Sequence, residues 1–411
     1  MLFGRAPGHP TVNDVQPMVG DDEVVEILAR WKAAGGPQPE LAVPGTVDTT
    51  PIDRALPPLS VRSFDRDVDT AWRRTSYSAL SAAGAPHAGT ADRVLSEPDD
   101  APEVEDLELD DLEAAEDATA READLALTAV ASPMADQPVG AAFGSLVHEV
   151  LEHADPAADD LRAELLAQVE EHRAWWAVEV DAETLADALV QVCDSPLGPL
   201  AGGLTLRDIT VPDRLRELDF ELPLAGGDLA PRDASAAAHV VLGDLGPLLR
   251  THLPEGDPLL AFADTLEGDA DLAAQRLLGY LTGSIDVVVR VPVDGRTRYL
   301  TIDYKTNWLG DRAAPATAWE YRPAVLDEAM GHSDYPLQAL LYTVVLHRYL
   351  RWRLPDYDPS EHLGGVLYLY LRGMCGPQTP SVDGRPCGVF SWQPPVALVT
   401  ALSDLLDGAT R

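Results

Sequence analysis

The sequence predicts an α/β fold with a central mixed β-sheet flanked by helices. Two observations lead to this class. Segments with apolar residues at helical spacing are interspersed along the chain with β-branched runs in which apolar and polar residues alternate. The dipeptide Asp294-Gly295 lies between two of these runs, where it is typical of a tight hairpin turn. Helices and strands mixed in this way around a hairpin are characteristic of an α/β domain.

The chain is expected to have three parts. Residues 1–90 contain two predicted helices, over 21–34 and 75–84, which begin at Asp, Ser or Thr residues. Residues 91–133 are dense in Asp and Glu and poor in aromatic residues, so they cannot bury a core and are predicted to form a flexible acidic linker. Residues 134–411 are predicted to form the compact domain.

Most predicted elements belong to this compact domain. Apolar residues at helical spacing predict helices over 144–154, 159–178, 182–193, 258–281, 335–351 and 394–407. Short apolar and β-branched runs predict strands over 205–222, 283–292, 297–305 and 364–372. The strands would form the sheet, and the helices would cover it.

The chain is strongly acidic. Its 411 residues include 68 Asp and Glu against 30 Lys and Arg, which gives a formal net charge of -38. Neutralising phosphates requires Lys and Arg, so this charge argues against a protein that binds nucleic acid over its whole surface. A local basic channel, or a metal ion that bridges carboxylates and phosphate, is compatible with it.

The cysteines and the lengths of the apolar stretches indicate the cellular compartment in which the protein is expected. Cys193, Cys375 and Cys387 form no CxxC pair, so neither a disulfide framework nor a structural zinc site is expected. No run approaches the roughly 18 apolar residues of a membrane helix. The N-terminal segment also lacks the long apolar core of a signal peptide. We therefore expect a cytoplasmic protein with no membrane partner.

The predicted hairpin brings charged residues together. A two-residue turn at Asp294-Gly295, where both positions tolerate positive φ, would set Asp286 directly opposite Asp303. Their Cβ atoms would then be roughly 5 Å apart. Because side chains alternate along a strand, Lys305 would lie on the same face as Asp303.

Two interpretations of this hairpin are open. Like charges opposite each other destabilise a sheet, and a cation between two carboxylates removes the conflict; Mg²⁺ and Mn²⁺ suit such oxygen ligands. A lysine beside that ion could orient water or help deprotonate it, as metal-assisted phosphodiester hydrolysis requires. The alternative is an exposed hairpin with an ordinary Asp303–Lys305 ion pair. Pro292 could also shift the register, because proline cannot donate to the ladder.

A histidine-containing helix is predicted over 143–153, "FGSLVHEVLEH". His148 and Glu152 are one turn apart on a face away from its apolar stripe. A zinc-protease HExxH motif would need histidine where Glu152 stands, and the inverted HxxEH motif would need it where Glu149 stands, so both fail. His153 is expected to lie on an ordinary charged helix face.

Five strings, taken in order, resemble the nuclease domain of the RecB family within the PD-(D/E)XK nuclease superfamily. They are "GSLVHEVLE", "GSIDVVV", "DYKTNWLG", "YPLQALLYTVVLHRYL" and "GGVLYLYLRGM". The resemblance covers essentially residues 60–411, and "DYKTNWLG" and "YLYLRGM" are its most specific parts. It implies a restriction-endonuclease-like core, with residues 1–90 as the remnant of a helicase region and a lead-in segment.

The resemblance also implies roles for individual residues. His148, Asp286, Asp303 and the backbone carbonyl of Tyr304 would ligate Mg²⁺. An imidazole is an unusual ligand for Mg²⁺, so Mn²⁺ is expected as a substitute. Lys305 would act on the attacking water, with Asp286 and Asp303 as its catalytic partners.

Candidate DNA contacts lie on the helix predicted over 335–351. Gln338 and Tyr342 match the family's QxxxY element and are implied to help hold DNA, although packing in the core is the alternative for Tyr342. Arg348 and Arg351 belong to the densest basic stretch of the chain, which makes them candidates for phosphate contact. The alternative for both arginines is a solvated helix end.

The resemblance implies a Mg²⁺-dependent exonuclease that hydrolyses phosphodiester bonds at single- and double-stranded DNA ends during break repair and recombination. RecC-like and RecD-like subunits would be its partners. The GxxxxGK[ST] loop of an ATPase motor is absent from this sequence. An AddA-type or stand-alone nuclease, or a non-catalytic assembly module, are the alternatives, and the complete set of His148, Asp286, Asp303 and Lys305 argues against the last.

Overall fold

The computed structural model describes residues 20–35, 73–82, 125–225, 240–331 and 333–408. The chain forms two compact units, Met1–Asp67 and Val68–Arg411. In the first unit the described residues form α1 (Asp21–Ala33), which confirms the predicted helix. Most of the predicted acidic linker lies outside the described residues. None of the described helices is long and apolar enough to cross a membrane.

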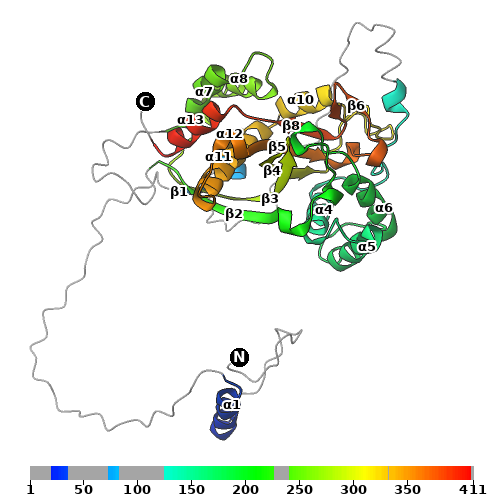
Figure 1. Cartoon of the computed structure of the whole chain (residues 1–411), viewed down its shortest axis with the longest axis vertical. Coiled ribbons are helices and arrows are strands. Elements are labelled where there is room, and N and C mark those ends of the chain that lie inside the picture. The colour runs from blue at the N-terminus through cyan, green and yellow to red at the C-terminus, as the bar shows by residue number, and fades with distance from the viewer. Residues whose placement is uncertain (1–19, 36–72, 83–124, 226–239, 332, 409–411) are drawn as a thin grey trace, which may run out of the picture. The chain divides into compact units, whose positions relative to one another are not determined.

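The second unit is built on a mixed six-stranded sheet (Figure 1). Its strands are β1 (Arg73–Ser76), β2 (Arg214–Pro223), β3 (Gly279–Val293), β4 (Arg296–Lys305), β5 (Leu363–Tyr370) and β8 (Val389–Trp392). Strand β3 is the centre of the arrangement, because β2 pairs antiparallel along one edge while β1 and β4 share the other. The sheet continues through β5, parallel to β4, and β8, antiparallel to β5. The mixed sheet expected from the sequence is therefore present.

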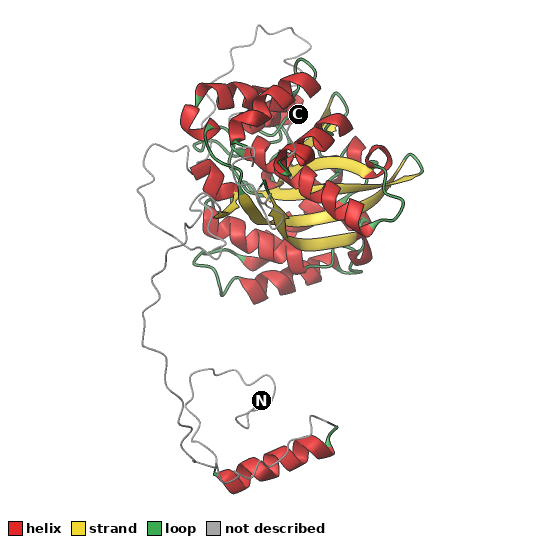
Figure 2. Cartoon of the chain, turned by 90° about the vertical axis from the view of Figure 1, so that its left-hand side faces the viewer, coloured by secondary structure: helices red, strands yellow, loops and turns green. Residues whose placement is uncertain are grey.

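Helices cover both faces of this sheet (Figure 2). They are α2 (Tyr77–Ala82), α4 (Ala141–His153), α5 (Leu161–His172), α6 (Ala182–Cys193), α7 (Leu245–His252), α8 (Ala261–Gly268), α9 (Ala270–Ala273), α10 (Pro323–Gly331), α11 (Tyr335–Arg353), α12 (Pro359–His362) and α13 (Val396–Leu406). A short hairpin of β6 (Ser381–Val382) and β7 (Arg385–Pro386) lies outside the sheet. Carboxylates of Asp160 and Asp181 accept backbone hydrogen bonds at the start of α5 and α6, which fixes where these helices begin.

Two large hydrophobic clusters form most of the core, one on each face of the sheet, and a third, small cluster contains Leu127, Ala318 and Cys387. Helices α7, α8, α10, α11 and α13 contribute to one cluster, and α4, α5 and α6 contribute to the other. Alternate residues of β5 enter the two clusters: Val366, Tyr368 and Tyr370 on one face, Leu367 and Leu369 on the other. Every residue of β5 is buried, as expected for a strand covered on both sides.

Most predicted elements are confirmed, and four differ. The single helix expected over 258–281 is wrong in its second part, because α8 and α9 end by Ala273 and the following apolar residues begin β3. The helix expected over 159–178 ends as α5 at His172. The strand expected over 205–222 starts only at Arg214, because two 3₁₀ turns fill the preceding residues. The segment expected to form a helix over 75–84 begins instead as strand β1, and only its second part is helical.

The central hairpin has the predicted turn and register. Asp294 and Gly295 have φ of 52° and 76°. Pairing runs from Val293–Arg296 to Val287–Ile302 without a shift, so Pro292 does not change it. This turn therefore sets which face each residue of β4 occupies.

A buried arginine joins two elements that meet at the predicted site. Arg372, just after β5, is fully buried. Its guanidinium donates to the carbonyls of Thr306 at 2.8 Å and Met134 at 2.7 Å, and also to that of Pro138. Its charge lies 5.2 Å from the ring centroid of Trp308. Arg372 thus ties the loop that precedes α4 to the end of β4.

We expect Arg372→Met to lower the free energy of unfolding by more than about 3 kcal/mol. Several buried carbonyls would lose their donor, and each such loss costs about 1–3 kcal/mol. Urea unfolding measures the change. Arg353→Met, at an exposed arginine of α11, is the matched control and should stay within about 0.5 kcal/mol. Equal effects of the two changes would contradict the structural role of Arg372.

We expect Gly295→Ala to lower the free energy of unfolding by about 1–2 kcal/mol, because an L-residue is strained at this positive φ. Gly246→Ala is the control, since Gly246 is helical with open space at its Cβ position, and it should be neutral or stabilising. Urea unfolding of both variants tests this; a neutral Gly295→Ala would show that the turn tolerates a side chain.

Candidate active site

The predicted catalytic residues converge where α4, β3 and β4 meet. Asp286 lies in β3, and Asp303, Tyr304 and Lys305 end β4. His148 lies in α4, whose apolar residues are buried against the sheet and so turn the imidazole toward the strand ends. The structure therefore brings together five residues from distant parts of the sequence, with His148 and Lys305 157 positions apart.

Asp286, Tyr304 and His148 form a hydrogen-bonded group. The Tyr304 N–H donates to Asp286 Oδ2 at 2.9 Å. His148 Nε2 lies 2.8 Å from the Tyr304 carbonyl oxygen, and His148 Nδ1 lies 3.5 Å from Asp286 Oδ2. With a proton on Nε2 the imidazole donates to the carbonyl. An imidazole, a carboxylate and a backbone carbonyl thus face one point.

Strand pairing on both sides of β3 is interrupted at Asp286. Regular pairing between β3 and β4 ends at Val287–Ile302, one step before Asp286 would face Asp303. Pairing between β2 and β3 also omits Asp286, while it continues on either side with Val287 and Ile285. The Asp286 carboxylate replaces the missing ladder bond by accepting from Tyr304. Its side chain is only 16% exposed, so this carboxylate is held inside the fold.

Asp303 and Lys305 form a buried ion pair. Asp303 is 2% exposed, and its Oδ2 lies 2.7 Å from Lys305 Nζ. Burial raises the pKa of Asp303 above its usual range; Lys305 opposes the shift and the charge of Asp286 adds to it. Burial acts to lower the pKa of Lys305, but the Asp303 carboxylate holds it above its ordinary value. The Lys305 ammonium, which also lies 4.2 Å from the Tyr335 ring centroid, is therefore charged at neutral pH.

The donor set fits a divalent cation. Asp303 Oδ2 is buried, and apart from its ion pair with Lys305 it has no hydrogen bond of regular geometry among the described residues. Its neighbours Asp286 and the Tyr304 carbonyl add oxygen donors, and His148 adds one nitrogen. Oxygen-rich sets of this kind suit Mg²⁺ or Mn²⁺. A cation would also neutralise the repulsion between the two aspartates.

Glu217 is a candidate functional residue that sequence reasoning missed. It lies in β2 at the step where the β2–β3 pairing omits both Glu217 and Asp286, and its φ is 41°, where non-glycine residues are rare. Ser284 Oγ donates to its Oε2 at 2.8 Å. The residue lies at the exposed rim, but partial burial of its carboxylate raises its pKa, and Asp286 and Glu152 add to the shift. Its position depends on a pairing between distant segments, which no local sequence signal reveals.

Gln338 and Tyr342 lie behind the predicted catalytic residues and not on an open surface. Each is 7% exposed. Gln338 Nε2 donates to the Tyr342 hydroxyl at 3.0 Å, and that hydroxyl donates to the Ser284 carbonyl at 2.6 Å. Tyr368 donates to Gln338 Oε1 at 3.0 Å. The predicted DNA contact therefore has no exposed group here, and the pair instead fixes β3 two residues before Asp286.

The two basic candidates of α11 differ. Arg348 donates to the Ser403 carbonyl at 2.6 Å and to the Pro223 carbonyl at 3.0 Å. It also pairs with Asp407 at 2.8 Å, and its side chain is 11% exposed. Its guanidinium is used within the fold, which disfavours the predicted phosphate contact. Arg351 is exposed.

Comparison with known proteins gives relatives along the whole chain. The sequence is 53% identical to "RecBCD enzyme subunit RecB" of Mycobacterium tuberculosis (strain H37Rv) and 52% identical to the protein of the same name from Mycolicibacterium smegmatis, in both cases over 99% of this chain. It is 29% identical to the Escherichia coli K12 protein of that name over 66% of this chain and 20% of that protein. The chain spans about a third of the length of the mycobacterial relatives, 35% and 36%.

The family match covers the predicted catalytic residues described above. The sequence profile of the PD-(D/E)XK nuclease superfamily matches residues 120–383, which include α4 and strands β2 to β5. Enzymes of this superfamily generally depend on a divalent metal ion, in agreement with the donor set at the ends of β3 and β4. The chain therefore belongs to the PD-(D/E)XK nuclease superfamily.

Proposed function

We propose that this chain is the nuclease part of a RecB-type subunit and hydrolyses phosphodiester bonds at DNA ends, with Mg²⁺ as its ion and Mn²⁺ as a substitute. The observation that carries the proposal is the convergence of His148, Asp286, Asp303 and the Tyr304 carbonyl beside Lys305. The similarity to RecB over 99% of the chain supports the same reaction class.

His148, Asp286, Asp303 and the Tyr304 carbonyl would hold the ion. When bound, a divalent cation stabilises the charge that develops on phosphate and makes water a better nucleophile. The chain's own contribution is to place these donors before the substrate arrives. The hydrogen bond from Tyr304 to Asp286 does so by fixing the carboxylate and the carbonyl in one unit.

Lys305 would position water and stabilise charge. Because Asp303 holds its pKa above the ordinary value, the ammonium is a hydrogen-bond donor and not a proton acceptor. It would donate to the attacking water or to a non-bridging phosphate oxygen as water adds to phosphorus and the ester oxygen leaves. The proton lost by water would pass to a carboxylate, and Glu217 is the candidate because its pKa is raised.

The substrate and partners are proposed from the resemblance to the RecB family, and the relatives' name points to a RecBCD complex. Single- and double-stranded DNA ends would be the substrate, and RecC-like and RecD-like subunits the partners, in break repair and recombination in the cytoplasm. A net charge of -38 opposes the approach of DNA to the isolated chain. Partner subunits that supply a basic path would offset this repulsion, with Arg351 as the proposed contact from this chain.

We expect the purified chain to degrade end-labelled linear single-stranded DNA with Mg²⁺ and not with EDTA. Lys305→Ala and Asp303→Asn should each slow cleavage by at least about 100-fold, because each removes a charge that acts on the transition state. His362→Ala, at a histidine outside this group, is the control. Cleavage that persists in EDTA or in both variants would refute the assignment.

A folded chain that does not cleave alone should be assayed again with RecC-like and RecD-like subunits. Cleavage that appears only in the complex, and that depends on Lys305, supports a nuclease that needs its partners. No cleavage in the complex would favour a non-catalytic assembly module.

We expect the cleavage rate to fall as pH is lowered from about 7 to about 5, at a fixed Mg²⁺ concentration. Asp303 must be deprotonated to act, and its raised pKa moves this loss above the range of an ordinary aspartate. Lys305 keeps its proton throughout, so it should add no inflection below about pH 9. A pH–rate profile tests both points; a rate that is flat down to pH 5 would contradict the proposed role of the carboxylates.

A further inference from the structure

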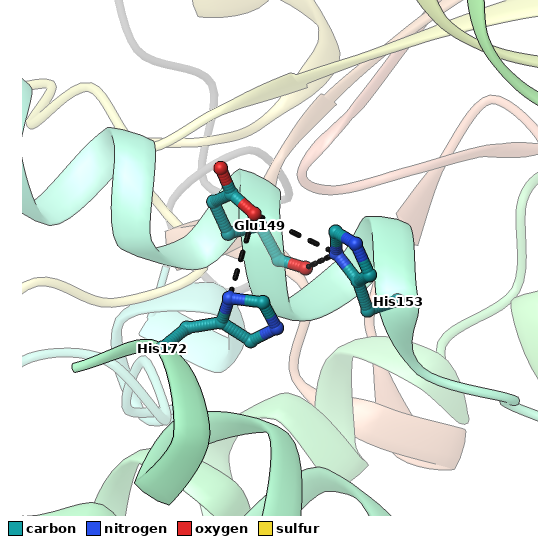
Figure 3. Close-up of side chains that lie close together, drawn as sticks. All are labelled: Glu149, His153 and His172. Carbon is teal, nitrogen blue, oxygen red and sulfur yellow. Dashed lines mark hydrogen bonds and ion pairs between the residues drawn. The ribbon is translucent and has the colours of Figure 1, made fainter. Parts of the chain in front are cut away.

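A second group of potential metal ligands lies on α4, one residue along from His148. Glu149 and His153 are one helical turn apart on this helix, and both face His172, the last residue of α5 (Figure 3). Potential ligand atoms of the three residues all lie within 4.8 Å of one another. His148 and Glu152 occupy the neighbouring face of the helix.

The spacing of these atoms resembles that of ligands around one ion. Glu149 Oε2 lies 3.5 Å from His172 Nδ1 and 3.6 Å from His153 Nδ1. Both distances exceed those of ordinary N–H···O hydrogen bonds. Tetrahedral ligands at about 2.0–2.1 Å from zinc lie roughly 3.3–3.4 Å from each other. The two separations therefore correspond to edges of a coordination shell.

His172 is largely buried and presents one ring nitrogen to Glu149. Its side chain is 13% exposed, and the atom that faces Glu149 is Nδ1, which leaves the other ring nitrogen, Nε2, outside the group. Its ring lies against that of His153 with centroids 4.7 Å apart. Within the described part of the chain, Glu149 forms ion pairs with these two histidines and with no lysine or arginine.

The ligand chemistry selects the class of ion. Two imidazole nitrogens and one carboxylate oxygen suit Zn²⁺ and similar late transition metals better than Mg²⁺. His153 and His172 are at the C-terminal ends of α4 and α5, where the helix dipoles favour a cation. Glu152 Oε2 lies 3.9 Å from His153 Nδ1 and is available as a fourth ligand. His153 would exchange its present hydrogen bond, 2.9 Å from the Glu149 carbonyl, for the ion.

We propose that Glu149, His153 and His172 bind a Zn²⁺-like transition-metal ion that clamps the C-terminal ends of α4 and α5. Because α4 also carries His148, such a clamp would hold the helix that reaches the nuclease centre. This second site does not depend on the proposed function, since none of its three residues belongs to the proposed Mg²⁺ ligands.

Co²⁺ titration of the full chain tests the proposal, with visible absorption as the readout and Zn²⁺ as the competitor. The titration uses an Asp286→Asn, Asp303→Asn background, which removes two acidic ligands of the proposed nuclease centre. We expect about one equivalent of Co²⁺ in a site that Zn²⁺ displaces. His172→Ala and Glu149→Gln should weaken binding at least about 10-fold, whereas His172→Cys keeps a ligand for zinc and should retain it.

His252→Ala, at a histidine of α7, is the matched control and should bind as the background does. Zn²⁺ should also raise the melting temperature of the background protein and not that of His172→Ala. Absence of saturable Co²⁺ binding, or equal affinity in a folded His172→Ala protein, would overturn the proposal. Loss of DNA cleavage with this site intact would instead count against the proposed nuclease centre alone.

Discussion

The hydrogen bond from the Tyr304 N–H to Asp286 Oδ2 is the interaction on which the proposed catalytic group depends. It forms where the β3–β4 ladder stops, so a side chain takes the place of a backbone acceptor. This one bond turns the Asp286 carboxylate toward β4 and fixes the Tyr304 peptide, whose carbonyl then faces His148. Three groups from three elements are held in one geometry by hydrogen bonds of the protein itself. Donors that are fixed by the fold in this way meet the condition for electrostatic preorganisation.

Charges this deeply buried are stable only because the fold surrounds them with partners. Asp303 and Lys305 compensate each other inside the sheet, and Tyr335 covers the ammonium. Behind them, Gln338 and Tyr342 use their polar atoms to hold β3 in place. Arg372 holds the loop before α4 to the end of β4. The proposed reactive groups are few, and a larger set of buried hydrogen bonds keeps them aligned.

The sequence predicted the features of the structure that depend on residues close together in the chain. The Asp294-Gly295 turn fixes the hairpin register, and with it the shared position of Asp286, Asp303 and Lys305, because nearby residues suffice to specify a two-residue turn. Glu217 was missed because its link to Ser284 joins residues 67 positions apart. The burial of Gln338 and Tyr342 could not be predicted either, because the QxxxY pattern does not indicate which face of α11 packs against the sheet. His153 was expected on an ordinary charged face, because its neighbour His172 lies on a different helix.

Strand β1 belongs to the same folded unit as the elements that come after the acidic stretch of the sequence. Residues Arg73–Ser76 pair with β3, and Leu80 is fully buried in the core, so both belong to the same unit as the strands and helices after residue 125. The intervening acidic residues therefore connect two parts of one folded body. Strand β1 and helix α2 are thus built from residues far before the rest of the sheet in the sequence. The entropy cost of bringing such distant segments together grows only slowly with the number of residues between them, so a long separation in sequence costs this fold little.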